Sequence, residues 1–519
     1  MGQSETASVR ASMDKAEDLR AEQLEMPDAV KPGDVDEELE EALRNYVPGS
    51  PEEKKLLRKI DLRLMPILWI MYILNYVDRT NIGNAKIAGM EDDLNLDDQK
   101  YAWVLSIFFF GYLLCEVPSN MILSRSRPSL FLPGIMIVWG ALSAAMSASQ
   151  TYGAMLAFRF VVGCIESGFF PGVLYLLSCW YTSGELGKRF TIFYTAATLS
   201  GAVGGLISGG ITDGLHNAHG ISGWRWLFIV EGVCTCGVAF CAIFILLDYP
   251  ATSPALNLEE KQLATIRLIA DTRSREGGDA SSSAGRRLTH TQAFAAAVVD
   301  YRTWFFLVLL MLNVGSGTIS YFIPTLTKTL GYDGVTAQYM TVPIYVVAAL
   351  VANCAAVAAD RVQRRRGGTG ARAPFVAAFL ALGCAGAVVC AAVAHHVVRY
   401  VMTCFVAAGI WTALPLALAW ISNTINTPPE KRAIVLALVN ACGNLSSVYG
   451  SRIWPDRDAP DYRMGWGVTA GFLGAATVMV LVSPLVFRIP WKELDVLKAQ
   501  GDVERSGEAR VEEGEREAR

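Results

Sequence analysis

The sequence predicts an all-α membrane protein with twelve transmembrane helices arranged in two six-helix halves. Of its 519 residues, 52% are hydrophobic and only 18% are charged. The apolar residues also gather into runs of about 18 to 25 residues, long enough for a helix to cross roughly 30 Å of hydrocarbon. Such runs lie near residues 62–83, 101–123, 129–149, 153–180, 190–212, 226–248, 304–328, 338–360, 373–394, 397–422, 433–451 and 465–488.

Basic residues near the predicted helices set the expected orientation. Lys54, Lys55 and Arg58 precede the first helix, whereas the loop after it carries EDDLNLDD (91–98). Because basic loops stay in the cytoplasm, and later basic loops such as RVQRRR (361–366) fall on the same side, we expect both termini to be cytoplasmic. The expected location is the plasma membrane.

Polar segments divide the chain into five expected parts. These are a cytoplasmic acidic tail (1–60), an N-terminal six-helix half (61–249), a cytoplasmic connector (250–303), a C-terminal six-helix half (304–489) and a cytoplasmic tail (490–519). The connector contains REGGDASSSAGRR (275–287), whose composition is typical of a flexible linker.

Two loops at matching places in the halves resemble each other. WYTSGELGKRF (180–190) follows the fourth predicted helix, and WISNTINTPPEKRA (420–433) follows the tenth. Each has a Trp at the membrane end, then polar residues, an acid and a Lys-Arg pair. Two matching halves are typical of transporters whose halves rock about a central site.

Several chemistries find no support in the sequence. The eleven cysteines fall within predicted helices, and the closest pair, Cys234 and Cys236, lacks the further ligands of a zinc site. No phosphate-binding loop or GxSxG motif occurs. We therefore expect no enzyme, no cofactor, no metal and no nucleic-acid partner, but a monomer that works in the lipid bilayer.

Charged residues inside predicted helices mark the candidate site. Asp78 and Arg79 in the first helix and Arg159 in the fourth fall at about the same depth, 7 to 9 Å from the outer ends at 1.5 Å per residue. Because an isolated charge in the membrane is costly, such residues face the protein interior and pair. The sequence thus predicts an Asp78–Arg159 pair that leaves Arg79 for a substrate anion.

Glu166 follows Arg159 by two helical turns and lies on the same helix face. A carboxyl in a buried cavity can take up and release a proton near neutral pH, so Glu166 is a candidate for proton coupling. A purely structural ion network remains the alternative. Glu116, near the cytoplasmic end of the second helix, is expected to help hold a gate.

The second half offers neutral hydrogen-bonding groups in place of buried acids. They are Asn313, Tyr321, Tyr345, Asn423, Asn440 and Asn444. Asn440 and Asn444 are one turn apart and face the same way. This division predicts that the first half binds protons and the anionic group of the substrate, while the second half recognises the rest of the substrate. Helix packing through buried amides is an equal alternative for any single Asn.

Several long segments, in the same order, resemble the major facilitator superfamily, in particular the fungal allantoate permease-like group of its anion:cation symporter branch. They are LNYVDRTNIGNAKI (74–87), GYLLCEVPSN (111–120), RFVVGCIESGFFPG (159–172), GWRWLFIVEG (223–232), PTLTKTLGYDGVTAQYMTVPIY (324–345) and PDRDAPDYRMG (455–465). The resemblance covers about residues 60–490 and implies a twelve-helix fold with proton-coupled uptake of organic anions.

The resemblance also implies roles for individual residues. Asp78 and Glu166 would couple protons, and Arg79 and Arg159 would bind the anion. Gates at the cytoplasmic ends would include Arg125, Asp360 and Arg361. The loop SNMILSRSRPS (119–129) lacks the usual Gly and Asp before its basic residues, whereas DRVQRRR (360–366) keeps the counterpart.

The sequence therefore predicts a secondary active transporter for proton-coupled uptake of a small organic anion by alternating access. Relatives in the resembled group carry vitamins such as nicotinate, pantothenate or biotin, as well as allantoate, small peptides and other carboxylates. Three alternatives remain open: a passive channel, an exporter and a nutrient sensor. A passive channel would need no buried titratable pair. An exporter of the same fold would carry a Gly-Pro pair in the fifth helix, which has Gly but no Pro; a nutrient sensor would have an enlarged cytoplasmic domain, and these tails are short.

Overall fold

The computed structural model describes residues 42–123, 126–276, 290–366, 372–425 and 429–487, and within these ranges it contains helices and no strand. The first group of elements comprises α3 (Pro51–Ala85), η1 (Lys86–Met90), α4 (Glu91–Asp93), α5 (Asp98–Leu123), α6 (Pro128–Met146), α7 (Tyr152–Glu166), α8 (Phe169–Trp180), α9 (Ser183–Leu215), η2 (Ala218–Gly220) and α10 (Gly223–Ile245). After α11 (Leu258–Glu276) and α12 (His290–Val299) comes the second group: α13 (Tyr301–Gly317), η3 (Thr318–Tyr321), α14 (Ile323–Thr329), α15 (Gly334–Tyr339), α16 (Thr341–Arg366), α17 (Ala373–Ala392), α18 (His396–Thr424), α19 (Pro429–Leu445), α20 (Ser447–Gly450), η4 (Asp456–Asp458) and α21 (Arg463–Val486).

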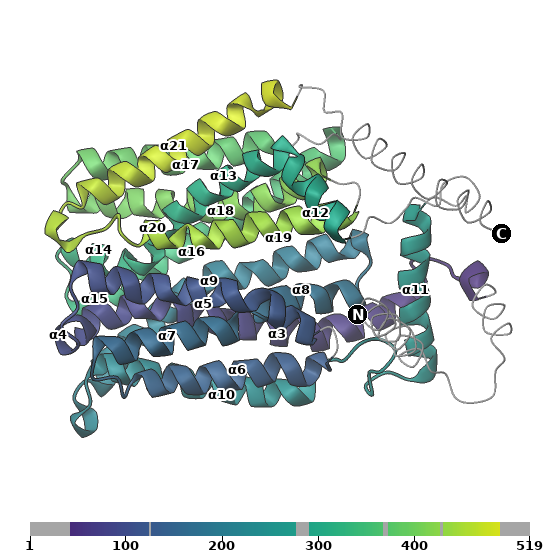
Figure 1. The fold of residues 1–519 in the computed structure, drawn as a ribbon, viewed down its shortest axis with the longest axis horizontal. Helices are drawn as coiled ribbons and strands as arrows, with labels where there is room; N and C mark the ends of the chain where they lie inside the picture. The colour runs from purple at the N-terminus through teal and green to yellow at the C-terminus, as the bar shows by residue number, and fades with distance from the viewer. Residues whose placement is uncertain (1–41, 124–125, 277–289, 367–371, 426–428, 488–519) are drawn as a thin grey trace, which may run out of the picture.

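The helices run side by side in two stacked groups (Figure 1). Helices α3 to α10, coloured from purple through blue to teal, form the lower group in that view, and helices α13 to α21, coloured from teal-green to yellow, form the upper one. In the described part of the chain, eleven helical stretches are long and apolar enough to cross a membrane. Helix α5 is not among the eleven, but its 26 residues occupy the place of the second predicted helix. The predicted all-α membrane fold is confirmed.

The bundle has two distinct ends, which we name after elements at them. The α4 end carries α4, η2 and η4, and the α11 end carries α11 and α12 (Figure 1). At the α4 end the groups pack closely, with α9 against α15 and α16 and α5 against α19 and α20. Small residues permit this approach, because a Cβ on Gly83 of α3 would overlap the Tyr321 carbonyl of η3.

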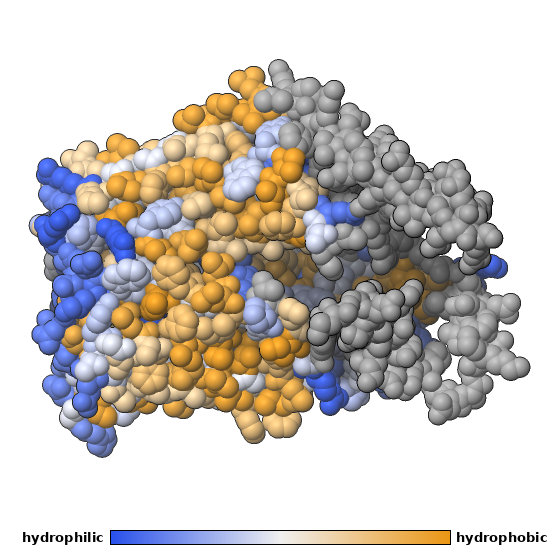
Figure 2. Space-filling view, in the orientation of Figure 1, coloured by the Kyte–Doolittle hydropathy of each residue, from blue (hydrophilic) through white to orange (hydrophobic). Residues whose placement is uncertain are grey.

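Apolar side chains cover the outside of the bundle. Val233, Phe240 and Phe244 of α10 are 61%, 59% and 76% exposed, and Leu481 and Leu485 of α21 are both 65% exposed. Figure 2 shows hydrophobic surface along the length of the helices, with hydrophilic side chains gathered at the α4 end. So large an exposed apolar surface is a lipid-facing surface.

Two predicted helices are interrupted in the structure. The run at 153–180 divides into α7 and α8 at Ser167 and Gly168, where a Cβ on Gly168 would overlap the Ser119 side chain of α5. The run at 304–328 consists of α13, the turn η3 and α14, which begins with Pro324 in its first turn. Both breaks lie beside the interior residues described below.

Part of the connector is helical, whereas most of the segment 275–287, on which the flexible-linker prediction rests, lies outside the described residues. The described part of the connector holds two helices, α11 and α12, and residues 277–289 lie outside the described ranges. Arg267 fixes α11 to the first group: it is 1% exposed, its Nε lies 3.1 Å from Glu53 Oε1, and it also donates to Glu185 of α9. A buried arginine with two carboxylate partners holds this helix in place.

Candidate functional site

A buried ion pair joins α3 to α7 inside the first group. Arg79 Nε donates a hydrogen bond to Glu166 Oε1, and Asn75 Nδ2 donates to the same oxygen over 2.9 Å. Asn75 and Arg79 are one turn apart on α3, so both reach the same partner. Arg79 is 7% exposed and Glu166 is fully buried. Glu166 Oε2 accepts no hydrogen bond from any described residue.

Asp78 faces a different side of α3, and the predicted Asp78–Arg159 pair is wrong. Asp78 Oδ2 accepts hydrogen bonds from Trp139 Nε1 of α6 over 3.0 Å and from Thr235 Oγ1 of α10 over 3.3 Å. Successive helix residues point about 100° apart, and here Asp78 faces α6 and α10 while Arg79 faces α7. Equal predicted depth did not identify which helix faces meet, because the residue of α7 that pairs with α3 is Glu166, two turns from Arg159.

Arg159 contacts aromatic and backbone groups instead of a carboxylate. Its Nε donates to the Val104 carbonyl over 3.4 Å, and its guanidinium carbon lies 4.8 Å from the centroid of the Phe108 ring. The guanidinium carbon of Arg79 also lies near Phe108, 5.4 Å from its ring centroid, and 4.8 Å from the ring centroid of Tyr112. The ring faces stabilise both cations where water is excluded.

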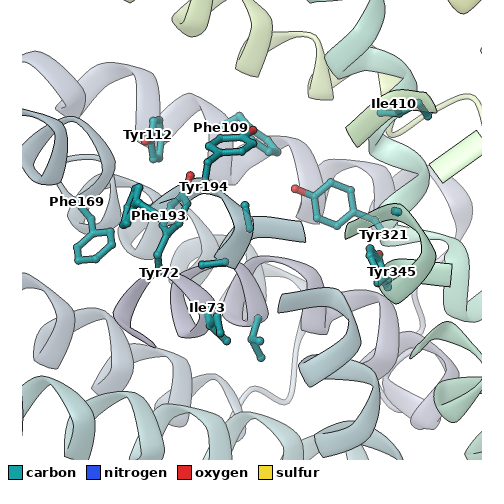
Figure 3. Packing of buried hydrophobic residues seen from close by; sticks show 14 of the residues in the cluster. Tyr72, Ile73, Phe109, Tyr112, Phe169, Phe193, Tyr194, Tyr321, Tyr345 and Ile410 are labelled. Carbon is teal, nitrogen blue, oxygen red and sulfur yellow. The ribbon is translucent and has the colours of Figure 1, made fainter. Parts of the chain in front are cut away.

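A cavity of about 90 Å³ lies between the two groups, beside Arg79. Its lining consists of Tyr76, Arg79, Thr80, Phe109, Tyr194, Ala197, Ser200, Gly201, Asn313, Val314, Gly317, Thr318, Ser320, Tyr321, Tyr345, Ile410, Trp411, Leu414, Asn444 and Ser447. Among these described lining residues, Arg79 alone is charged. In Figure 3 the Tyr321 hydroxyl points from the second group toward Phe109 and Tyr194 of the first.

The structure brings together only part of the predicted binding set. Arg79, Tyr321 and Asn444 line the cavity, whereas Arg159 and Asn440 do not. Sequence reasoning missed lining residues such as Tyr194, Ser200, Trp411 and Ser447, because aromatic and small residues within a transmembrane helix are usually packing residues. Only their position opposite Arg79 distinguishes them.

Three of the predicted gate residues, Glu116, Asp360 and Arg361, are not among the described residues that line the cavity. Glu116 is half-buried on α5, and Arg125 lies outside the described residues. Asp360 accepts a hydrogen bond from Arg372 over 2.7 Å, within the second group, and Arg361 beside it is exposed. Their role in gating stays a prediction.

A second ion pair closes the α4 end. Lys86 Nζ lies 2.5 Å from Asp456 Oδ2 and 3.7 Å from Glu91 Oε1, and over the Tyr101 ring at 4.8 Å. The backbone N–H of Asp456 donates to Asp98 Oδ1 over 2.8 Å. Lys86 and Asp456 come from different groups, so their pair, which we call the latch, ties the groups together.

The latch carboxylate stays charged over a wide range of pH. Burial raises the pKa of Asp456, but the hydrogen bond and the charge of Lys86 lower it more, and the pKa of Asp456 lies below its ordinary value. Next to the latch, Ser106 and Ser451 hydroxyls lie 3.0 Å apart across the groups. In the sequence, Lys86 lies in the segment NIGNAKI and Asp456 in the segment PDRDAPD. Neither segment indicates that the other contains its partner.

Comparison with known proteins decides the family. The model of the Major Facilitator Superfamily matches residues 68–451. The chain belongs to this superfamily. It is 34% identical to the MFS-type transporter cnsO of Penicillium expansum over 455 residues, which covers 85% of this chain and 84% of the relative. It is 32% identical over 422 residues to the uncharacterized transporter C1683.12 of Schizosaccharomyces pombe, covering 81% of this chain and 83% of that one.

Solved structures agree in fold. A bacterial homolog of the human lysosomal transporter Spinster, inward-facing and unoccupied, superposes with a TM-score of 0.63 at 15% identity, covering 86% of this chain and 99% of that one. The xylose transporter XylE from E. coli, in a partially occluded inward-open conformation, superposes with a TM-score of 0.62 at 13% identity. The superposition covers 81% of this chain and 97% of that one. At these identities the likeness concerns the fold alone.

In this major facilitator protein, the two matching loops carry matching ion pairs at the α11 end. Arg189, from GELGKRF, donates to both carboxylate oxygens of Asp61, with Nε–Oδ1 and Nη2–Oδ2 distances of 2.6 and 2.8 Å. Lys431, from PPEKRA, lies 2.8 Å from Asp300 Oδ2, and both side chains are fully buried. Each pair joins the start of a later helix to the first helix of its own group, at Asp61 within α3 and at Asp300, the N-cap of α13.

Proposed function

We propose that this protein is a secondary active transporter that takes up a small organic anion together with protons by alternating access. One observation supports this most directly: the single charged side chain lining the described cavity is a cation, Arg79, and its anionic partner is a titratable acid, Glu166. A carboxylate substrate would bind Arg79 through charge-assisted hydrogen bonds.

The Arg79–Glu166 pair provides a coupling mechanism. An unpaired charge is costly at this depth in a membrane, so Arg79 retains one anionic partner at a time. When Glu166 binds a proton it loses its charge, and Arg79 is released to bind the substrate carboxylate. When Glu166 loses that proton to the cytoplasm it competes for Arg79 again and displaces the anion.

Other residues complete the proposed site. Tyr321 and Asn444 line the cavity and supply neutral hydrogen-bonding groups for the rest of the substrate. Arg159 and Asn440, farther from the cavity, would act on the substrate through the positive potential and the packing around it. Asp78 would carry a second proton.

Alternating access requires the two groups to part at one end at a time. Residues 61–249 and 304–489 would move as two units, with the latch opening at the α4 end and Glu116, Arg125, Asp360 and Arg361 holding the α11 end. The α4 end would face the outside of the plasma membrane and both termini the cytoplasm. Cysteines at Asp97 and Arg365, labelled with an impermeant reagent on intact cells, test this orientation: only Asp97→Cys should react.

Uptake by a host that lacks its own carriers tests the function. The panel contains nicotinate, pantothenate, biotin and allantoate, with nicotinamide as an uncharged match for nicotinate. We expect uptake of at least one carboxylate, rejection of its amide and loss of accumulation when the proton gradient is collapsed. Accumulation unaffected by the proton gradient, or net export, would contradict the proposal.

A further inference from the structure

Glu231 is a buried acid that the site described above does not use. It lies on α10, is 3% exposed and does not line the central cavity. Neither of its carboxylate oxygens has a hydrogen-bond partner among the described residues. A polar group that is buried without any partner is rare and calls for an explanation.

The place of Glu231 on its helix connects it to Asp78. Thr235 follows Glu231 by one turn on the same face of α10, and Thr235 donates a hydrogen bond to Asp78. Helix α10 packs against both α3 and α6, which carry Asp78 and Trp139. Among the described residues, Asp78 and Cys234 are the ionisable groups whose charges act on Glu231.

The two acids have unequal surroundings. Asp78 accepts hydrogen bonds from Trp139 and Thr235, which stabilise its ionised form, whereas Glu231 accepts none. A carboxylate without donors or a cation is strongly disfavoured in an apolar interior, and two neighbouring carboxylates disfavour ionisation of each other further. A single proton held by these two acids would therefore be more stable on Glu231 than on Asp78 in this conformation.

We propose that Glu231 and Asp78 share one transported proton, which rests on Glu231 when the α4 end is closed. The two carboxyl groups are not in hydrogen-bond contact in this conformation, so the releasing step begins with a movement that brings them together or with a water molecule that bridges them. The Glu231 O–H bond then breaks, an oxygen of the Asp78 carboxylate gains a proton, and Glu231 becomes the anion while Asp78 becomes neutral. Charge and atoms balance within the pair. The proposal rests on proton coupling as the proposed function and places the second proton on the pair rather than on Asp78 alone.

Infrared spectroscopy of the purified, reconstituted protein tests the protonation without any substrate. Wild type at neutral pH should show a C=O stretching band of a protonated carboxyl that Glu231→Gln removes and Glu231→Asp shifts. Asp213→Asn, an exposed acid on α9, is the matched control and should leave the band unchanged. If the Glu231→Gln protein is not inserted in the membrane, the shift of the C=O band in Glu231→Asp tests the proposal instead. A spectrum that neither variant alters would overturn the proposal.

Accumulation measurements test transport of the proton. The probe is the carboxylate identified by the uptake panel, in vesicles with one unit of pH gradient and no membrane potential. Each coupled proton contributes about tenfold to the accumulation ratio. Glu231→Gln should lower that ratio about tenfold while exchange at equal pH continues. If the wild-type protein accumulates substrate in response to the pH gradient and Glu231→Gln reaches the same accumulation ratio, this inference alone is refuted. If accumulation by the wild-type protein does not depend on the pH gradient, the proposed function is refuted as well.

Discussion

Lys86 of η1 and Asp456 of η4, which are 370 residues apart in the chain, lie 2.5 Å apart and join the two helix groups. The side chain of Lys86 is only 3% exposed, so breaking this pair leaves a buried cation short of one of its two carboxylate partners. Opening of the α4 end must therefore supply Lys86 with water or with another anion.

Charge exchange tests the latch. Lys86→Asp and Asp456→Lys each place like charges together and should open the α4 end, whereas the double variant restores an attractive pair. Spin labels at Asp97 and Met464, both exposed, report the separation of the groups. We expect the double variant to be more closed than either single one, with an interaction energy of about 1 kcal/mol or more. Additive effects would mean that the pair does not hold the end.

The latch should not respond to mild acid. The pKa of Asp456 lies below its ordinary value. The pair therefore stabilises the closed end fully at any pH above the ordinary pKa of an aspartate. That stabilisation is lost only as the pH falls through the lowered pKa of Asp456. In a Glu91→Gln background, which removes the other carboxylate beside Lys86, the spin-label distance should be the same at pH 7 and pH 5, whereas Lys86→Ala should lengthen it at both. A distance that grows between pH 7 and pH 5 would show that another group controls closure.

Arg79→Lys should weaken substrate binding. Lysine keeps the charge but loses the planar fork that binds a carboxylate through two hydrogen bonds. We expect apparent affinity to fall about tenfold or more, equivalent to roughly 1.4 kcal/mol. Arg159→Lys is the matched control, since Arg159 does not line the cavity, and should change affinity less. An equal loss of affinity in both variants would contradict a direct role for Arg79 in binding the substrate.

Glu166→Gln should uncouple transport. Glutamine resembles the protonated acid, so Arg79 stays available to the substrate in both orientations. Binding and exchange between the two faces should persist, while accumulation driven by the proton gradient is lost. Tracer exchange and net uptake in the same vesicles separate the two processes. A variant that still concentrates substrate as steeply as wild type would leave Glu166 as part of a structural ion network.

Gly83→Ala should hinder closure of the α4 end. The added Cβ would overlap the backbone carbonyl of Tyr321, which cannot move without its helix, and overpacking of this kind costs about 1 to 3 kcal/mol. Gly134→Ala, on α6, has no atom within 4 Å of the new Cβ and is the control. The first variant should show a larger spin-label distance and slower uptake than the second. Identical behaviour would exclude this contact as a determinant of closure.

The sequence by itself determined the membrane helices, the matching loops of the two halves and the charged residues that lie at the depth of the site. These features depend on length, composition and spacing along one helix, which are local properties of the chain. For the same reason it identified Arg79, Tyr321 and Asn444 as candidates before their cavity was known.

Only the tertiary structure decided which of these residues meet. The rotation of α3 directs Arg79 to Glu166 and Asp78 to Trp139 and Thr235, and the packing of the two groups brings Lys86 to Asp456. A one-residue step turns a side chain by about 100°, so equal depth leaves the partner undetermined. Pairing between distant helices depends on how whole helix faces pack, and no single segment carries that information.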